Sequence, residues 1–169
     1  MLGVLRVEDY NDFTEKVKPC SIEIERLEHN DTLVMDERVI MDRVGRQGIE
    51  RMVKAFYTKV PHDDILGPMY PKGDMQGAEE RLFDFLMFRL AGDPTYTEKR
   101  GHPRLRGRHM PFKIGARERD RWVELMTASM REAEIPEDVA VQLDAFFLQI
   151  ADFMRNVPEG NGINFNPRA

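Results

Sequence analysis

One histidine of this chain lies among residues suited to hold a flat, acidic ligand. His109 follows Leu105 by one helical turn, and Arg104, Arg106 and Arg108 surround that helical face with positive charge. A haem needs an imidazole for its iron, apolar walls for its ring and cations for its two carboxylates. The segment therefore suits haem, but the pattern is equally compatible with a solvated basic turn whose histidine binds nothing.

The remaining histidines and the cysteine offer less chemistry. His29 and His62 stand among polar loop residues, so we expect both side chains to be solvated. Cys20 is the only cysteine, which excludes an intramolecular disulfide, a cysteine cluster for zinc and a C-x-x-C-H site for covalent haem attachment. Any haem would be held non-covalently, and the chain suits a reducing cytoplasm.

Helices predicted from apolar spacing would position these residues. A first helix, predicted over residues 49–60, ends at Pro61, and an irregular connection then carries Tyr70. A second starts after Asp74 as N-cap and stops at Gly92. The apolar faces of these two helices comprise Ile49, Met52, Val53, Phe56, Tyr57 and Val60, and Met75, Ala78, Leu82, Phe85 and Leu86.

The C-terminal half predicts one short helix and two long ones. Pro103 and Pro111 leave room for about two helical turns that end near His109. Long helices follow Gly115 and Pro136. Their buried faces comprise Trp122, Leu125, Met126, Ser129 and Met130, and Val139, Leu143, Phe146, Phe147, Ile150 and Met154. Near the N-terminus, the run SIEIE alternates like a strand whereas the residues after it favour a helix, and both interpretations stay open.

Composition excludes several classes of protein. The 169 residues fit one domain, and 41% hydrophobic and 33% charged residues are typical of a globular chain. A net charge of -5 argues against nucleic acid as a partner. The apolar stretches are too short for a membrane span, and the acidic N-terminus is unlike a secretory signal, so we expect a cytoplasmic protein.

A long ordered series of motifs resembles the group II truncated haemoglobins. Phe56-Tyr57, GAEERL, TYTEKRGHPRLRGRHMPFKI and ERDRW follow one another at compatible spacing, and the resemblance covers roughly residues 44–157. It implies an all-α truncated globin, a 2-over-2 helical sandwich, with haem b (iron protoporphyrin IX) as cofactor. We expect an N-terminal extension over 1–35, the globin domain over 36–157 and a flexible tail over 158–169.

The resemblance also implies roles for individual residues. His109 matches the proximal iron ligand, and Arg108, Arg81 and Tyr96 match contacts to the haem propionates. Tyr57, Tyr70 and Trp122 match three polar distal residues, and Ala78 stands where many globins carry a distal histidine. The implied apolar walls are Leu82, Phe56, Phe85, Leu105, Phe112 and Met126. The first helix junction departs from the family, which often has a double glycine where this chain has Val44-Gly45-Arg46-Gln47-Gly48.

The implied function is binding of dioxygen, NO and CO by a monomer or homodimer. Bound dioxygen carries partial negative charge, which two phenols and an indole N–H would stabilise, so release should be slow and oxygen transport poor. Alternatives are a nitric oxide dioxygenase served by a reductase, a weak peroxidase, an oxygen or redox sensor, or a helical interaction module without haem.

Overall fold

The computed structural model describes residues 35–70 and 73–158, and all structural statements below concern these. The predicted extension over 1–35, the predicted tail over 158–169 and the SIEIE stretch lie wholly or almost wholly outside them. The described elements are α1 (Glu37–Lys59), η2 (Val60–His62), η3 (Gly67–Met69), α2 (Met75–Ala91), α3 (Thr95–Arg100), α4 (Leu105–His109), α5 (Ala116–Glu132) and α6 (Glu137–Phe153).

Helix α1 covers the predicted helix over 49–60 except for Val60, which begins η2, and it starts twelve residues earlier. The Asp36 carboxylate starts it by accepting hydrogen bonds from the backbone N–H groups of Arg38 and Val39. Gly45, at φ +64° and ψ 175°, bends the helix. Glycine adopts this backbone conformation without steric cost, so a single glycine makes the bend at the place where the family often has two.

The other long helices begin where the sequence predicts, and α2 also ends where predicted. Asp74 and Pro136 are the N-cap residues of α2 and α6, and Gly115 precedes α5. Gly92 ends α2 in the left-handed conformation, with φ +67°. The short helix α3 has no apolar periodicity and was not predicted from the sequence. Within the described residues, no helix is both long enough and apolar enough to cross a membrane.

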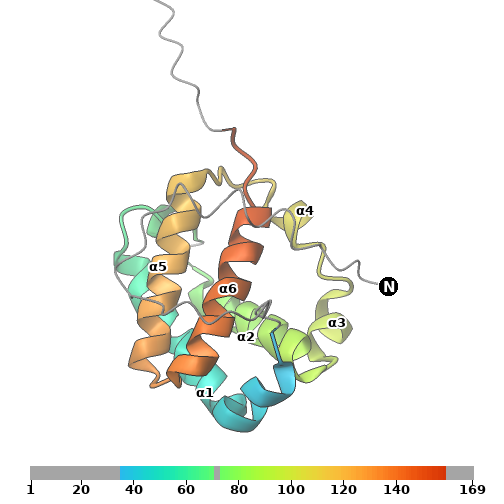
Figure 1. The fold of residues 1–169 in the computed structure, drawn as a ribbon. Helices are drawn as coiled ribbons and strands as arrows, with labels where there is room; N and C mark the ends of the chain where they lie inside the picture. Colours follow the sequence, from blue (N-terminus) through green and yellow to red (C-terminus); the bar gives the residue numbers. More distant parts are fainter. Residues whose placement is uncertain (1–34, 71–72, 159–169) are drawn as a thin grey trace, which may run out of the picture. The chain divides into compact units, whose positions relative to one another are not determined.

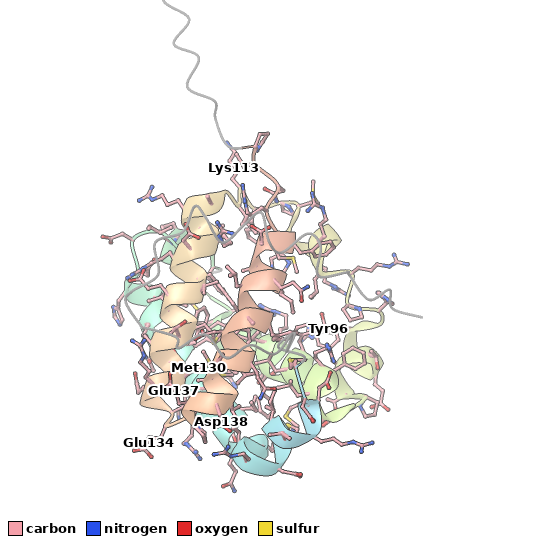
Figure 2. All side chains as sticks on the ribbon, viewed as in Figure 1. Tyr96, Lys113, Met130, Glu134, Glu137 and Asp138 are labelled. Atoms are coloured by element: carbon pink, nitrogen blue, oxygen red, sulfur yellow. The ribbon has the colours of Figure 1, made fainter. Side chains whose placement is uncertain are left out.

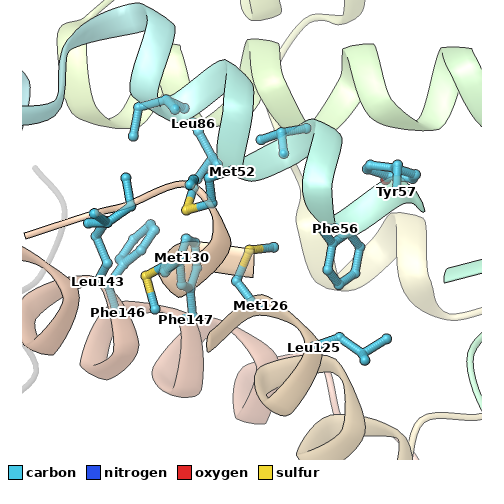
Figure 3. Close-up of a cluster of buried hydrophobic side chains, with 14 of the residues drawn as sticks. Met52, Phe56, Tyr57, Leu86, Leu125, Met126, Met130, Leu143, Phe146 and Phe147 are labelled. Atoms are coloured by element: carbon cyan, nitrogen blue, oxygen red, sulfur yellow. The ribbon is translucent and has the colours of Figure 1, made fainter. Parts of the chain in front are cut away.

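Two pairs of helices make up most of the fold (Figure 1). Helix α1 packs against α2, α5 packs against α6, and contacts between α1 and α5 join the two pairs. Their facing sides form one hydrophobic core, part of which is drawn in Figure 3. Met52, Phe56, Met126 and Met130 lie at its centre, with at most 1% of each side chain exposed. The core thus occupies the space between the pairs, while α3 and α4 lie outside it.

Candidate functional site

A cavity of about 320 Å³ opens between the core and the short helices α3 and α4. Its volume lies in the range of small-molecule and cofactor sites, and apolar side chains dominate its lining. Twelve of the fourteen predicted site residues line it: Tyr57, Tyr70, Ala78, Arg81, Leu82, Phe85, Tyr96, Leu105, Arg108, His109, Phe112 and Trp122. Phe56 and Met126 do not. Both are fully buried in the core, where Phe56 packs behind Trp122 with 5.5 Å between ring centroids.

The half-buried His109 side chain is oriented by its own helix. Its Nδ1 lies 2.7 Å from the carbonyl oxygen of Leu105, one turn earlier. A carbonyl only accepts hydrogen bonds, so Nδ1 must carry the proton and donate it. In the neutral imidazole Nε2 then keeps its lone pair, which is the form in which an imidazole binds a metal.

The set of possible metal ligands fits haem better than a bare ion. Among the described residues, no group of three or more His, Cys, Asp or Glu side chains is placed to hold a metal. Protein sites for bare transition metals take at least three protein ligands, whereas haem brings four ring nitrogens and needs one axial imidazole. A lone histidine beside an apolar cavity with arginines at its edge therefore suits haem.

Three aromatic side chains from different elements meet at another part of the cavity. We call Tyr57 of α1, Tyr70 after η3 and Trp122 of α5 the aromatic wall. The ring centroids of Tyr57 and Tyr70 are 5.8 Å apart, nearly edge to face. The Tyr70 hydroxyl accepts a hydrogen bond from the Trp122 indole N–H, and it is also hydrogen-bonded to the Tyr57 hydroxyl.

Burial keeps both phenols protonated at neutral pH. It raises the pKa of Tyr70 to about 12 and raises the pKa of Tyr57 further above its usual value, because phenolate is poorly solvated there. Both hydroxyls can therefore donate hydrogen bonds, and neither can act as a base near neutral pH.

Arg81 and Arg108 supply positive charge to the cavity lining. Arg81 pairs with Asp74 at 2.7 Å. The Arg108 guanidinium donates to the carbonyl oxygens of Pro103 and Arg100 at 2.8 and 2.7 Å. No described carboxylate pairs with Arg108, so its charge is available to an anionic ligand.

Tyr96 and Asp74 occupy defined positions beside the cavity. Tyr96, labelled in Figure 2, is buried between α2 and α3 and meets the Phe85 ring edge to face at 5.7 Å. The Asp74 carboxylate lies against the backbone of α2, where a Cβ on Gly77 would come within 2.1 Å of Oδ1. Glycine at this position therefore lets Asp74 reach Arg81.

Eleven lining residues were not predicted as site residues. Four of them, Phe146, Phe147, Ile150 and Met154, belong to the face of α6 that periodicity predicted as buried. The others are Leu66, Met69, Leu86, Ile114, Glu118, Arg119 and Ala151. For Leu86 and the four residues of α6, periodicity identifies a buried face without distinguishing a packed core from a cavity wall. The remaining six residues belong to no predicted buried face, so no sequence signal pointed to them.

Comparison with known proteins identifies the family. The model of the family described as bacterial-like globin matches residues 39–156. A crystal structure of a group II truncated haemoglobin from Bacillus anthracis matches with a TM-score of 0.67 and 30% identity, covering 70% of this chain and 97% of that one. The chain belongs to the group II truncated haemoglobins. The predicted family and the predicted all-α truncated globin fold are thereby confirmed.

Two further haemoglobin structures are similar to this globin. A thermostable haemoglobin from Thermobifida fusca is 45% identical with a TM-score of 0.67, covering 71% of this chain and 98% of its own. A truncated oxygen-avid haemoglobin from Bacillus subtilis is 30% identical with a TM-score of 0.65, covering 69% and 98%. Membership of the globin family implies a haem cofactor and a diatomic gas as ligand.

Proposed function

We propose that this globin holds haem b through His109 and binds dioxygen tightly, with NO and CO as further ligands, beside the aromatic wall. Haem supplies an iron atom with a coordination position open to a diatomic gas. The observation that carries the proposal is the shared cavity. It combines an imidazole whose free nitrogen is Nε2 with a hydrogen-bonded set of two phenols and an indole.

The aromatic wall supports tight binding because its donors are fixed before any ligand arrives. Tyr70 accepts a hydrogen bond from Trp122, and its own proton can then point toward a ligand. Each buried hydrogen bond to a ligand contributes about 1 kcal/mol, and about 1.4 kcal/mol corresponds to a tenfold change in affinity. Up to two such bonds, from the Tyr70 and Tyr57 hydroxyls, would slow ligand release about tenfold to a hundredfold, in keeping with the oxygen-avid relative from Bacillus subtilis.

We assign the cationic lining residues to the haem carboxylates. Arg108 and Arg81 would each offer guanidinium N–H donors to a propionate, and the Tyr96 hydroxyl would offer a third contact. The apolar side chains Leu82, Phe85, Leu105 and Phe112, together with Ala78, would cover the ring. We assign the globin domain to residues 36–157, which leaves an extension before it and a tail after it.

Absorption spectra of the full-length protein supplied with haem test the proposal directly. We expect a Soret band, and we expect His109→Gly to weaken haem affinity by about a hundredfold or more because it removes the imidazole that we assign to the iron. His62→Gly is the matched control, since His62 is exposed and does not line the cavity, and it should retain haem as the wild type does. Absence of a Soret band, or an identical band in His109→Gly, would contradict the haem assignment.

A further inference from the structure

The chain segment just after α6 is hydrogen-bonded to the segment that carries His109. The Asn156 side chain makes three of these bonds: Nδ2 donates to the carbonyl oxygens of His109 and Phe112 at 3.2 and 2.7 Å, and Oδ1 accepts from the Ile114 N–H at 3.0 Å. The Ile114 carbonyl oxygen in turn accepts from the backbone N–H groups of Asn156 and Val157, at 2.9 and 3.2 Å. One side chain thus spans the backbone from His109 to Ile114.

A second side chain reinforces the same junction from the opposite direction. The Arg106 guanidinium, on α4, donates to the carbonyl oxygens of Phe153 and Arg155 at 2.7 and 3.1 Å. The Phe153 carbonyl lies at the end of α6, where backbone acceptors lack helical partners, and the Arg155 carbonyl follows just after it. Lys113, which adjoins Ile114, lies at the same end of the molecule as the end of α6 (Figure 2).

Helix α4 needs such ties because packing does little to hold it. It has only five residues, none of them buried, whereas each of the four long helices buries at least five. Helices this short are unstable alone because nucleation is costly, and burial of an apolar face is what usually offsets that cost. The hydrogen bonds from Asn156 and Arg106 therefore replace packing as the restraint on the His109 backbone.

We propose that Asn156 is a positioning residue for the iron ligand. It fixes the carbonyl groups of His109 and Phe112, on both sides of the turn that follows α4, and with them the direction in which the imidazole points. The proposal rests on the assignment of His109 as the iron ligand. Asn156 is not among the residues that line the cavity, so its effect on the iron must pass through the His109 backbone.

Two substitutions distinguish a role of Asn156 in positioning His109 from a role that only holds the segment after α6 in place. Asn156→Ala removes all three side-chain hydrogen bonds. Asn156→Asp keeps an acceptor for the Ile114 N–H but turns a carboxylate oxygen toward the carbonyls of His109 and Phe112, which repel it. Gln142→Ala is the matched control, because it removes a hydrogen bond to Asp36 near the other end of α6, away from the cavity.

The iron–histidine stretching band of the ferrous protein, measured by resonance Raman spectroscopy, reports on the ligand itself. We expect this band to shift or broaden in Asn156→Ala and in Asn156→Asp. We expect both variants to transfer haem to excess apomyoglobin about tenfold faster than the wild type, equivalent to about 1.4 kcal/mol. Gln142→Ala should keep the wild-type band and transfer rate.

Thermal unfolding of the same proteins completes the test. Variants that lose stability but keep the wild-type band and transfer rate would overturn the proposal, as would rescue of the band by Asn156→Asp. If Asn156→Ala does not fold, the iron–histidine band and the haem transfer rate of Asn156→Asp decide the question. A wild-type protein with bound haem but without an iron–histidine band would instead refute the assignment of His109, which is a separate failure.

Discussion

The aromatic wall and the His109 segment border the same cavity but are held in place by different forces. Tyr57 belongs to a helix with eight buried residues, and Trp122 packs against the buried rings of Phe56 and Phe147. The His109 segment has no buried residue in α4, and Met110 and Phe112 after it are 57% and 39% exposed. Core packing holds the aromatic wall, whereas hydrogen bonds to the end of α6 hold the histidine.

This difference suggests that the two regions have separate functions. Close-packed cores resist displacement, so the aromatic wall can present its donors in a fixed geometry whether or not haem is bound. A segment secured mainly by hydrogen bonds near solvent opens more readily. We therefore expect changes in the aromatic wall to alter ligand release without loss of haem, and changes near His109 to alter haem retention first.

The double substitution Tyr70→Phe with Trp122→Phe should give the largest effect on ligand release. It removes two donors from the aromatic wall but keeps aromatic side chains, so we expect dioxygen to dissociate about a hundredfold faster, or about 2.7 kcal/mol. Stopped-flow mixing of the oxygenated protein with CO measures this rate. Tyr96→Phe is the control, since Tyr96 lines the cavity outside the aromatic wall and should leave the rate unchanged. Rapid haem loss from the double variant would contradict the division between the two regions.

The sequence predicted more of the aromatic wall than of the support for His109. Tyr57 and Trp122 lie on long helices, where apolar spacing reveals the buried face. The contribution of Asn156 depends on contacts with residues more than forty positions earlier, and an asparagine after a helix gives no pattern that points to them. Phe56 and Met126 mark a different limit. Both were correctly predicted as buried, but periodicity could not show that they pack in the core rather than line the cavity.

Alkaline pH should weaken the protein through the aromatic wall. The pKa of Tyr70 rises from 10.0 to about 12 on folding because phenolate is poorly solvated at that site. Its contribution is fully present below pH 10 and is lost as pH rises from 10 to about 12, because only the unfolded state ionises freely in that window. We expect about 2.7 kcal/mol of this loss to disappear in Tyr70→Phe, measured as the pH dependence of the free energy of unfolding in urea. If Tyr96→Phe reduces the pH dependence of the free energy of unfolding as much as Tyr70→Phe does, the effect is not specific to Tyr70.

The smallest expected effect concerns the loop that carries Tyr70. The buried Asp63 carboxylate accepts hydrogen bonds from the N–H groups of Ile65 and Leu66 and pairs with Arg121 at 2.6 Å, one residue before Trp122. Burial opposes ionisation, but the bonds from Leu66 and Arg121 outweigh it and hold the pKa of Asp63 below its usual value. Asp63 is therefore ionised at neutral pH. Its ion pair with Arg121 ties the loop that carries Tyr70 to α5, which carries Trp122.

Asp63→Asn keeps the shape of this side chain and removes its charge. Weakening a charge-assisted bond to the partly exposed Arg121 should cost about 1 kcal/mol and speed dioxygen release a few-fold, with no change in haem transfer. Asp93→Asn is a matched control, because Asp93 also binds loop backbone and an arginine, but its partners Thr95 and Arg46 do not adjoin a residue of the aromatic wall. If both substitutions change dioxygen release equally, the loop contact has no special link to the aromatic wall. If Asp63→Asn speeds haem loss instead, the two regions are coupled, and the separation between packing on one side and hydrogen bonding on the other does not hold.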